Sequence, residues 1–219
     1  APLAQLFRRT PVATWRTYLR YHALRQSADV LPKAVDDEFF GFFGKTLAGQ
    51  PEQRARWKRA VAATNGGVGD AVGAAYVARW FPAAAKAQVL ELVENLRRAY
   101  GARIDTLAWM SPETKAVAKR KLATFRPKIG YPDKWKDYSA LDVRRDDPFG
   151  NDARAQAWDW NRRLARIDRK TERDEWNMTP QTVNASYNPL FNEITFPAAI
   201  LQPPFFDPAA EPAVNYGGI

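Results

Sequence analysis

The sequence predicts an α+β protein that is predominantly α-helical, in which a helical lobe is followed by a short β-element. Two observations indicate this layout. Apolar residues recur at the spacing of an amphipathic helix through most of residues 1–176. After Trp176 the period changes to two, because Val183, Ala185 and Tyr187 alternate with polar residues as they would in a strand.

Four helical segments are expected in the first eighty residues. Their apolar stripes lie within residues 12–22, 35–47, 51–61 and 70–80. Pro51 is expected to open the third segment, since proline suits the first turn of a helix. The run Asn65-Gly-Gly-Val-Gly69 lacks the Lys-Ser/Thr pair of a phosphate-binding loop, so we interpret it as the break between the third and fourth segments.

The clearest helix signals come next along the chain. A helix is expected to begin near Pro82, because Val89, Leu92 and Leu96 fall on one face. A second helix is expected after Ser111, which can cap it with Pro112 at the first helical position.

The middle of the chain is expected to be less regular. Residues 127–133 are rich in Pro and Gly and are interpreted as a turn, and residues 134–148 as irregular chain. A helix is then expected over residues 151–166. Its buried face is expected to carry Ala153, Ala157, Trp160 and Leu164.

A β-hairpin is expected near the end of the chain. Residues 183–187 and 193–196 alternate in polarity, and residues 188–192 can form the loop between them. Prolines that follow, beginning with Pro197, end the second strand. We therefore expect a mainly helical region over residues 1–176 and a separate β-containing region over residues 177–219.

Composition limits the kinds of partner. The net charge is +9, and residues 177–219 hold three acidic residues and no basic one. Basic and acidic residues are interspersed before that, which favours an ordinary solvated surface over a nucleic-acid or anionic-membrane surface. No apolar run approaches the ~18–20 residues of a membrane span. We expect no nucleic-acid partner and no span in this chain.

No catalytic or metal-ligating residue is expected. A zinc site needs three or four ligands, and the chain has no Cys and a single His, His22, on an apolar helical stripe. Asp36, Asp37 and Glu38 are adjacent, so they do not face one another on a helix, and we interpret them as a solvated helix start. Motifs of a hydrolytic triad, such as G-x-S-x-G, are absent.

The remaining candidate site is the first C-terminal strand, with Asn184 and Ala185. A strand edge can pair with an extended peptide, and an Asn side chain offers both a donor and an acceptor. An Asn beside a hairpin also serves structural roles, so composition alone leaves both roles open.

Three C-terminal elements carry a resemblance to a known family. They are Val183-Asn-Ala-Ser-Tyr187, the run Phe196-Pro-Ala-Ala-Ile-Leu-Gln-Pro-Pro-Phe-Phe206, and Asn215-Tyr-Gly-Gly-Ile219. The chain resembles the neprilysin and endothelin-converting-enzyme family of zinc metallopeptidases, most of all its bacterial oligopeptidase-O members. Upstream elements, among them Ile129-Gly-Tyr-Pro-Asp133 and Glu175-Trp176, occur in the family's order.

The resemblance implies a zinc endopeptidase that cuts short peptides in a cavity between two lobes. It implies that residues 177–219 begin a zincin-like catalytic domain whose N-A-x-Y strand binds the substrate backbone antiparallel. By motif match, the substrate-binding residues are Asn184, through its side chain, and Ala185, through its carbonyl. The family's H-E-x-x-H zinc motif follows the N-Y-G-G-I element, so the zinc ligands are expected beyond residue 219 or on a second polypeptide.

Several consequences and two alternatives follow from this resemblance. This chain alone is expected to be inactive, and the enzyme to be extracytoplasmic (periplasmic or secreted), with a cytoplasmic location as the alternative. Apolar residues after Trp176 are expected to be exposed in the absence of a partner: Ile194, Phe196, Ile200, Leu201, Phe205 and Phe206. The alternative functions are a non-catalytic peptide-binding remnant and a basic helical module that binds anionic partners.

Overall fold

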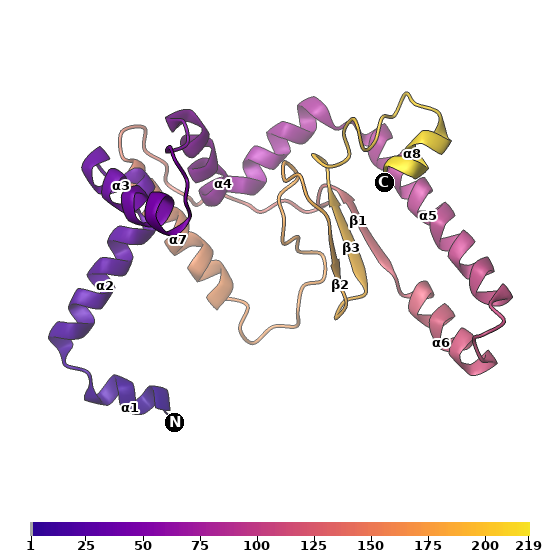
Figure 1. Ribbon diagram of the computed structural model, residues 1–219, viewed down its shortest axis with the longest axis horizontal. Helices are drawn as coiled ribbons and strands as arrows, with labels where there is room; N and C mark the ends of the chain where they lie inside the picture. Colours follow the sequence, from indigo (N-terminus) through magenta and orange to yellow (C-terminus); the bar gives the residue numbers. More distant parts are fainter. Residues whose placement is uncertain (1) are drawn as a thin grey trace. The chain divides into compact units, whose positions relative to one another are not determined.

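The computed structural model describes residues 2–219 and is mainly helical, with one three-stranded sheet (Figure 1). This confirms the expected α+β class. The chain divides into two compact units. Unit 1 comprises the residues up to 68 together with residues 139–168, and unit 2 comprises residues 69–138 and 169–219. The boundary expected after residue 176 concerns the domains of a complete protein and stays a prediction.

Unit 1 is built from short helices. They are α1 (Pro2–Arg9), α2 (Val12–Gln26), the 3₁₀ turn η1 (Ala28–Val30), α3 (Lys33–Phe39), the π-helical η2 (Phe40–Leu47), the first part of α4 (Arg56–Trp80), and α7 (Pro148–Leu164). The helix expected from residue 12 is confirmed. The start expected at Pro51 is wrong, because α4 begins at Arg56. Gln53 lies in the non-helical segment before α4, where its side chain donates a hydrogen bond to Asp36.

Asp36 corrects the expectation of a solvated acidic helix start. Its side chain is buried, and its carboxylate lies 2.6 Å from the Arg59 guanidinium of α4 and 3.3 Å from the Gln53 amide. Asp37 is exposed and pairs with Lys33 one turn earlier. Only Asp37 and Glu38 therefore behave as expected, because a cationic partner from α4 compensates the burial of Asp36.

Helix α7 turns a different face inward from the one expected. The stripe of Ala153, Ala157, Trp160 and Leu164 is exposed, and the Trp160 side chain is 62% exposed. Ala155 is buried instead, against Gly67 of α4, and Asp152 accepts a hydrogen bond from Ser27 at 3.4 Å. Within unit 1, α7 thus packs through its small and polar residues rather than through its larger apolar ones.

Unit 2 contains the sheet and the longest uninterrupted helix. Its elements are the second part of α4, α5 (Ala83–Thr106), α6 (Pro112–Ala123), β1 (Arg126–Gly130), β2 (Ser186–Asn188), β3 (Glu193–Pro197) and α8 (Pro212–Gly218). The helices expected near Pro82 and after Ser111 are confirmed. Ser111 caps α6 by accepting a hydrogen bond from the Thr114 N–H at 3.2 Å.

Helix α4 passes through the glycine run without ending. The expected break becomes a kink at Val68, whose φ of −133° and ψ of 40° are not helical. Gly69 and Gly73 follow the kink, and a Cβ on either would lie within 2.8 Å of Thr179 or Pro180. Glycine is required at these positions because the segment before β2 packs directly on this part of α4.

The three strands lie in the order β1-β3-β2 (Figure 1). β2 and β3 form the expected antiparallel hairpin, and β1 runs parallel to β3 with Lys128 opposite Thr195. The turn expected over residues 127–133 is therefore wrong, since residues 126–130 form β1. The strand tolerates Pro127 because β1 lies at the edge of the sheet, where a missing N–H breaks no central ladder.

A hydrophobic core fills the space between α5 and the C-terminal segment of unit 2. The core residues are Phe81, Ala85, Val89, Val93, Ile129, Ala198, Leu201 and Phe206. Leu201 is 1% and Phe206 is 2% exposed, so the expectation that both are exposed is wrong. Phe205 is exposed, and Ile194, Phe196 and Ile200 are half-buried. The apolar face of α5 covers Leu201 and Phe206, a partner that the sequence analysis did not identify.

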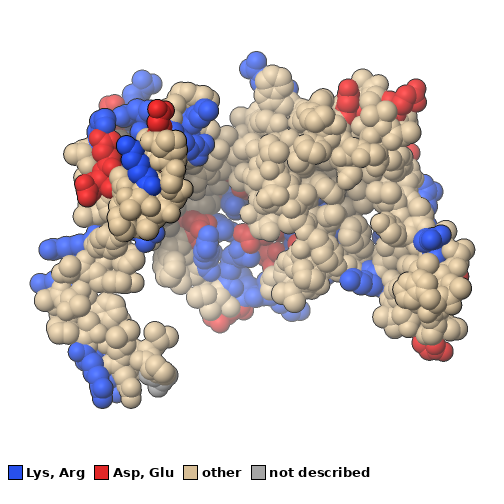
Figure 2. Space-filling view, viewed as in Figure 1, with Lys and Arg blue, Asp and Glu red and all other residues tan. Residues whose placement is uncertain are grey.

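The surface is mixed in charge. Figure 2 shows Lys and Arg interspersed with Asp and Glu over the face drawn, as in an ordinary solvated surface. Within residues 2–219, no helix has the length and apolar character that crossing a membrane requires.

Candidate functional site

The candidate site is the outer edge of β2. Among the residues described, β2 pairs only with β3, and the order β1-β3-β2 leaves its other side at the end of the sheet. The edge of a strand presents N–H and C=O groups that an extended peptide can pair with. Tyr187 and its two strand neighbours therefore offer a short template for an added strand.

Asn184 and Ala185 directly precede this edge. Both are exposed, and β2 begins three residues later than the alternation from Val183 predicts, at Ser186. The Asn184 Oδ1 accepts a hydrogen bond from the Ala185 N–H at 2.8 Å. The two residues are thus adjacent in solvent, with the amide of Asn184 folded back on its own backbone.

The chain on the N-terminal side of Asn184 is firmly held. Pro180 is buried, and its carbonyl accepts a hydrogen bond from the Ala199 N–H at 2.9 Å. The Gln181 amide donates to the Gly69 carbonyl of α4 at 3.0 Å. Pro180 and Gln181 are therefore fixed, and Asn184 becomes exposed only three residues later, which restricts the positions that Asn184 can adopt.

The hairpin on the other side of the edge is also held. The Asn188 Oδ1 accepts hydrogen bonds from the N–H groups of Leu190 at 3.0 Å and Phe191 at 3.4 Å, which closes the turn. The Asn192 side chain accepts from the Tyr187 hydroxyl at 2.9 Å and donates to the Lys121 carbonyl of α6 at 2.7 Å. Asn188 thus closes the hairpin turn, and Asn192 fixes the hairpin to α6.

A buried ion pair ties the strands together. The Lys128 ammonium of β1 lies 2.8 Å from the Glu193 carboxylate of β3, and each side chain is 6% exposed. The same ammonium donates to the Glu175 carbonyl at 2.9 Å. Nearby on the surface, the hydrogen bond from Arg126 lowers the pKa of the Asp174 carboxyl. Sequence reasoning missed Lys128 and Glu193, because their partnership depends on the parallel pairing of strands about 65 residues apart.

The residues of this chain do not fit a zinc ion. Within residues 2–219, no group of three His, Cys, Asp or Glu side chains is placed to hold a metal. The His22 ring lies 4.2 Å from the Tyr18 ring and 5.4 Å from the Tyr21 ring, measured between centroids, in an aromatic cluster. No catalytic step through zinc can be derived from these side chains.

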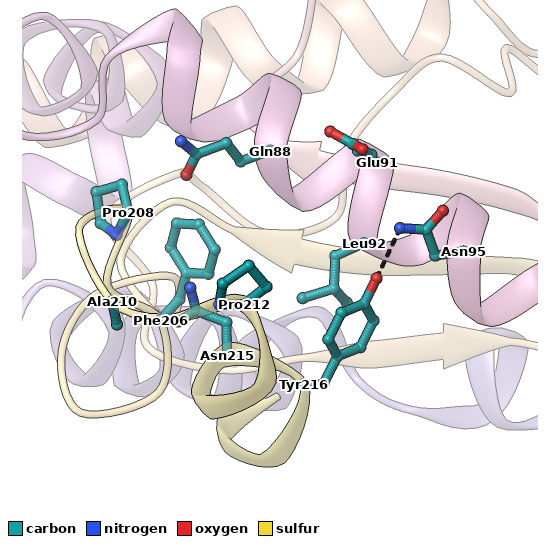
Figure 3. Close-up of a pocket in the computed structure, with 10 residues that line it drawn as sticks. All are labelled: Gln88, Glu91, Leu92, Asn95, Phe206, Pro208, Ala210, Pro212, Asn215 and Tyr216. Atoms are coloured by element: carbon teal, nitrogen blue, oxygen red, sulfur yellow. Dashed lines mark hydrogen bonds between the residues drawn. The ribbon is translucent and has the colours of Figure 1, made fainter.

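A pocket lies between α5 and the C-terminal segment of unit 2. Figure 3 shows this cavity, of about 230 Å³. It is lined by Gln88, Glu91, Leu92, Asn95, Phe206, Pro208, Ala210, Pro212, Asn215 and Tyr216. The Asn95 amide donates to the Tyr216 hydroxyl at 2.7 Å, and Asn215 is bonded to the Asp207 backbone at both ends of its amide. The Asn95–Tyr216 bond links the C-terminal segment to α5, whereas the Asn215 bonds brace that segment internally, and the residues that line the cavity include no acid–base pair.

Comparison with known families identifies the chain. The family model described as peptidase family M13 matches its N-terminal part over residues 1–132, and a second model with the same description matches residues 184–219. The chain belongs to peptidase family M13. Asn184 and Ala185, followed by the edge strand β2, lie at the start of the second M13 match.

Individual M13 relatives agree with this assignment. The chain is 32% identical over 209 residues to an endothelin-converting enzyme homolog of Locusta migratoria, which covers 92% of this chain and 29% of the relative. It is 49% identical, with a TM-score of 0.87, to the zinc metalloprotease Zmp1 of Mycobacterium tuberculosis solved with an inhibitor, covering 99% of this chain and 33% of that one. PepO from Lactobacillus rhamnosis is 36% identical, with a TM-score of 0.73, and the match covers 89% of this chain and 31% of the PepO chain. The chain thus spans about a third of the length of these M13 proteins.

Proposed function

We propose that this chain supplies the substrate-binding strand of a zinc metalloendopeptidase that cleaves short peptides. The observation that carries the proposal is the exposed edge of β2, with the exposed Asn184 and Ala185 directly before it, in a chain of peptidase family M13. The name of the Mycobacterium tuberculosis neighbour, a zinc metalloprotease, supports the same activity for the complete protein.

A peptide bound here would add an antiparallel strand beside β2. Asn184 would release the Ala185 N–H and turn its amide toward the peptide backbone, while the Ala185 carbonyl accepts a peptide N–H. The anchor at Pro180 and the hairpin on α6 hold the strand on both sides, so little ordering of the protein would be needed on binding.

The proposal places the rest of the active site outside these residues. Residues 177–219 would begin the catalytic domain, and the zinc ligands would lie beyond residue 219 or on a second chain. The chain's coverage of about a third of its relatives supports this division. The complete enzyme would be extracytoplasmic, and residues 1–219 alone would bind no stoichiometric zinc and cleave nothing.

The test is Asn184→Ala in the complete zinc-loaded enzyme. Loss of a hydrogen bond to the peptide backbone should lower kcat/KM by roughly tenfold, with zinc content unchanged. Asn177→Ala is the matched control, since Asn177 is exposed and lies outside the edge. Equal activity of the two variants would exclude Asn184 from substrate binding.

The same preparation separates the alternative functions. A non-catalytic peptide-binding remnant would bind peptides but yield no metal-dependent cleavage in any assembled form. A basic helical module would bind duplex DNA with an affinity that falls steeply with salt and that Asn184→Ala leaves unchanged.

A further inference from the structure

Two cations flank the β2–β3 hairpin. The Lys121 ammonium lies 5.9 Å from the centre of the Tyr187 ring, and the Arg173 guanidinium lies 5.5 Å from the centre of the Phe191 ring. Arg173 also donates a hydrogen bond to the Phe191 carbonyl. Lys121 thus lies beside Tyr187 of β2, and Arg173 is held at the hairpin turn by the ring and the carbonyl of Phe191.

No acidic side chain neutralises either cation. Among the residues described, neither Lys121 nor Arg173 has a carboxylate within ion-pair distance, and both are exposed. Two acids of the same region pair with other cations, since Asp174 pairs with Arg126 and Glu193 pairs with Lys128. Glu172, beside Arg173 in sequence, is exposed and pairs with neither cation.

The strand direction decides which part of a peptide meets these charges. β2 runs from Ser186 to Asn188 and then enters the hairpin. An antiparallel peptide therefore has its C-terminal side beside Asn184 and its N-terminal side beside the hairpin. Because neighbouring strands lie about 4.8 Å apart, peptide residues opposite Tyr187 come within reach of the Lys121 ammonium.

We propose that this edge selects peptides with Asp or Glu in the segment N-terminal to the part held by Asn184. A carboxylate opposite Tyr187 would meet the Lys121 charge, and one closer to the hairpin turn would meet the Arg173 charge, whereas a Lys, an Arg or a free N-terminal amine would be repelled. This inference rests on the proposed function and names the substrate class of the same site.

The test uses three quenched fluorescent peptides that differ only in Glu, Gln or Lys at one position on the N-terminal side. The complete enzyme should cleave the Glu peptide with a kcat/KM about fivefold above that of the Gln peptide, and the Lys peptide more slowly still. The Glu/Gln ratio should fall toward one as salt rises, because exposed charges are screened. This ratio needs no variant, so it does not depend on the folding of a mutant.

Variants assign the preference to the two cations. In Lys121→Gln/Arg173→Gln the Glu/Gln ratio should fall to about one, whereas Lys45→Gln, at an exposed lysine of unit 1, should keep the full ratio. A ratio near one in the unaltered enzyme, or a ratio that survives the double change, would overturn this inference while leaving peptide cleavage in place. If no peptide is cleaved, the proposed function fails and the preference fails with it.

Discussion

The two units bury apolar side chains to very different extents. Unit 2 has a core that includes Phe81, Leu201 and Phe206, all at most 2% exposed. In unit 1 the only apolar residues described as buried are Ala28 and Ala155, while large side chains on its helices are exposed. Because burial of apolar area is the main stabilising contribution to folding, we expect unit 2 to resist unfolding far better than unit 1.

The largest expected effect comes from removing a core ring of unit 2. Phe206→Ala should lower the free energy of unfolding by roughly 3–5 kcal/mol, since it leaves a cavity between α5 and the C-terminal segment. Phe42→Ala, at a half-exposed ring of unit 1, should cost under about 0.5 kcal/mol. Hydrogen exchange resolved by unit would measure both, and equal losses would contradict the contrast between the units.

The buried ion pair of unit 2 should show the next largest effect. Lys128→Met leaves the Glu193 carboxylate buried without its partner and should cost about 3 kcal/mol. The double variant Lys128→Met/Glu193→Leu removes both charges and should recover most of that loss. Urea unfolding would compare the two, and a double variant no more stable than the single one would show that packing, rather than charge, sets the cost.

Helix caps allow a matched comparison between the units. Ser111 caps α6 in unit 2, and Asp147 caps α7 in unit 1 through the Gly150 N–H at 2.8 Å. Each change to Ala should cost about 1 kcal/mol locally. In the Asp147→Ala variant we expect amide hydrogen exchange to become faster only in unit 1. In the Ser111→Ala variant we expect it to become faster only in unit 2. A loss shared by both units would mean that they unfold together.

The smallest expected effect is a dependence on pH at Asp174. Its hydrogen bond to Arg126 lowers its pKa below the ordinary value of 3.8, so it stabilises the folded chain above that pH and ceases to do so as the pH falls through the lowered pKa. Asp174→Asn should therefore be slightly less stable than the unaltered chain at about pH 6, with the difference vanishing in stronger acid. A difference that grows on acidification would contradict this sign.

Local signals along the sequence were sufficient for much of the fold. Spacing and capping identified α2, α5 and α6, and two-residue alternation identified the β2–β3 hairpin. The site residues Asn184 and Ala185 came from a family motif, because nothing in the composition separates a substrate-binding Asn from a structural one.

Features that depend on distant partners could not be predicted. β1 contains Pro127 and the buried Lys128, neither of which is typical of a strand. It forms because it pairs in parallel with β3, and the Glu193 carboxylate of β3 compensates the buried charge of Lys128. Likewise, the local sequence predicts that Asp36 is a surface residue, because it does not show that Arg59 lies beside it in the fold. The inward face of α7 depends on the small residue Ala155 rather than on the larger apolar stripe.

An open sheet edge also invites a second copy of the same chain. β2 is only three residues long, which leaves little template for edge-to-edge aggregation. In an antiparallel pairing of two β2 edges, Lys121 beside the central residue Tyr187 would lie close to the Lys121 of the second copy, and the two like charges would repel. The Lys121 charge proposed to attract acidic peptides would therefore also disfavour self-association at the edge that is proposed to bind them.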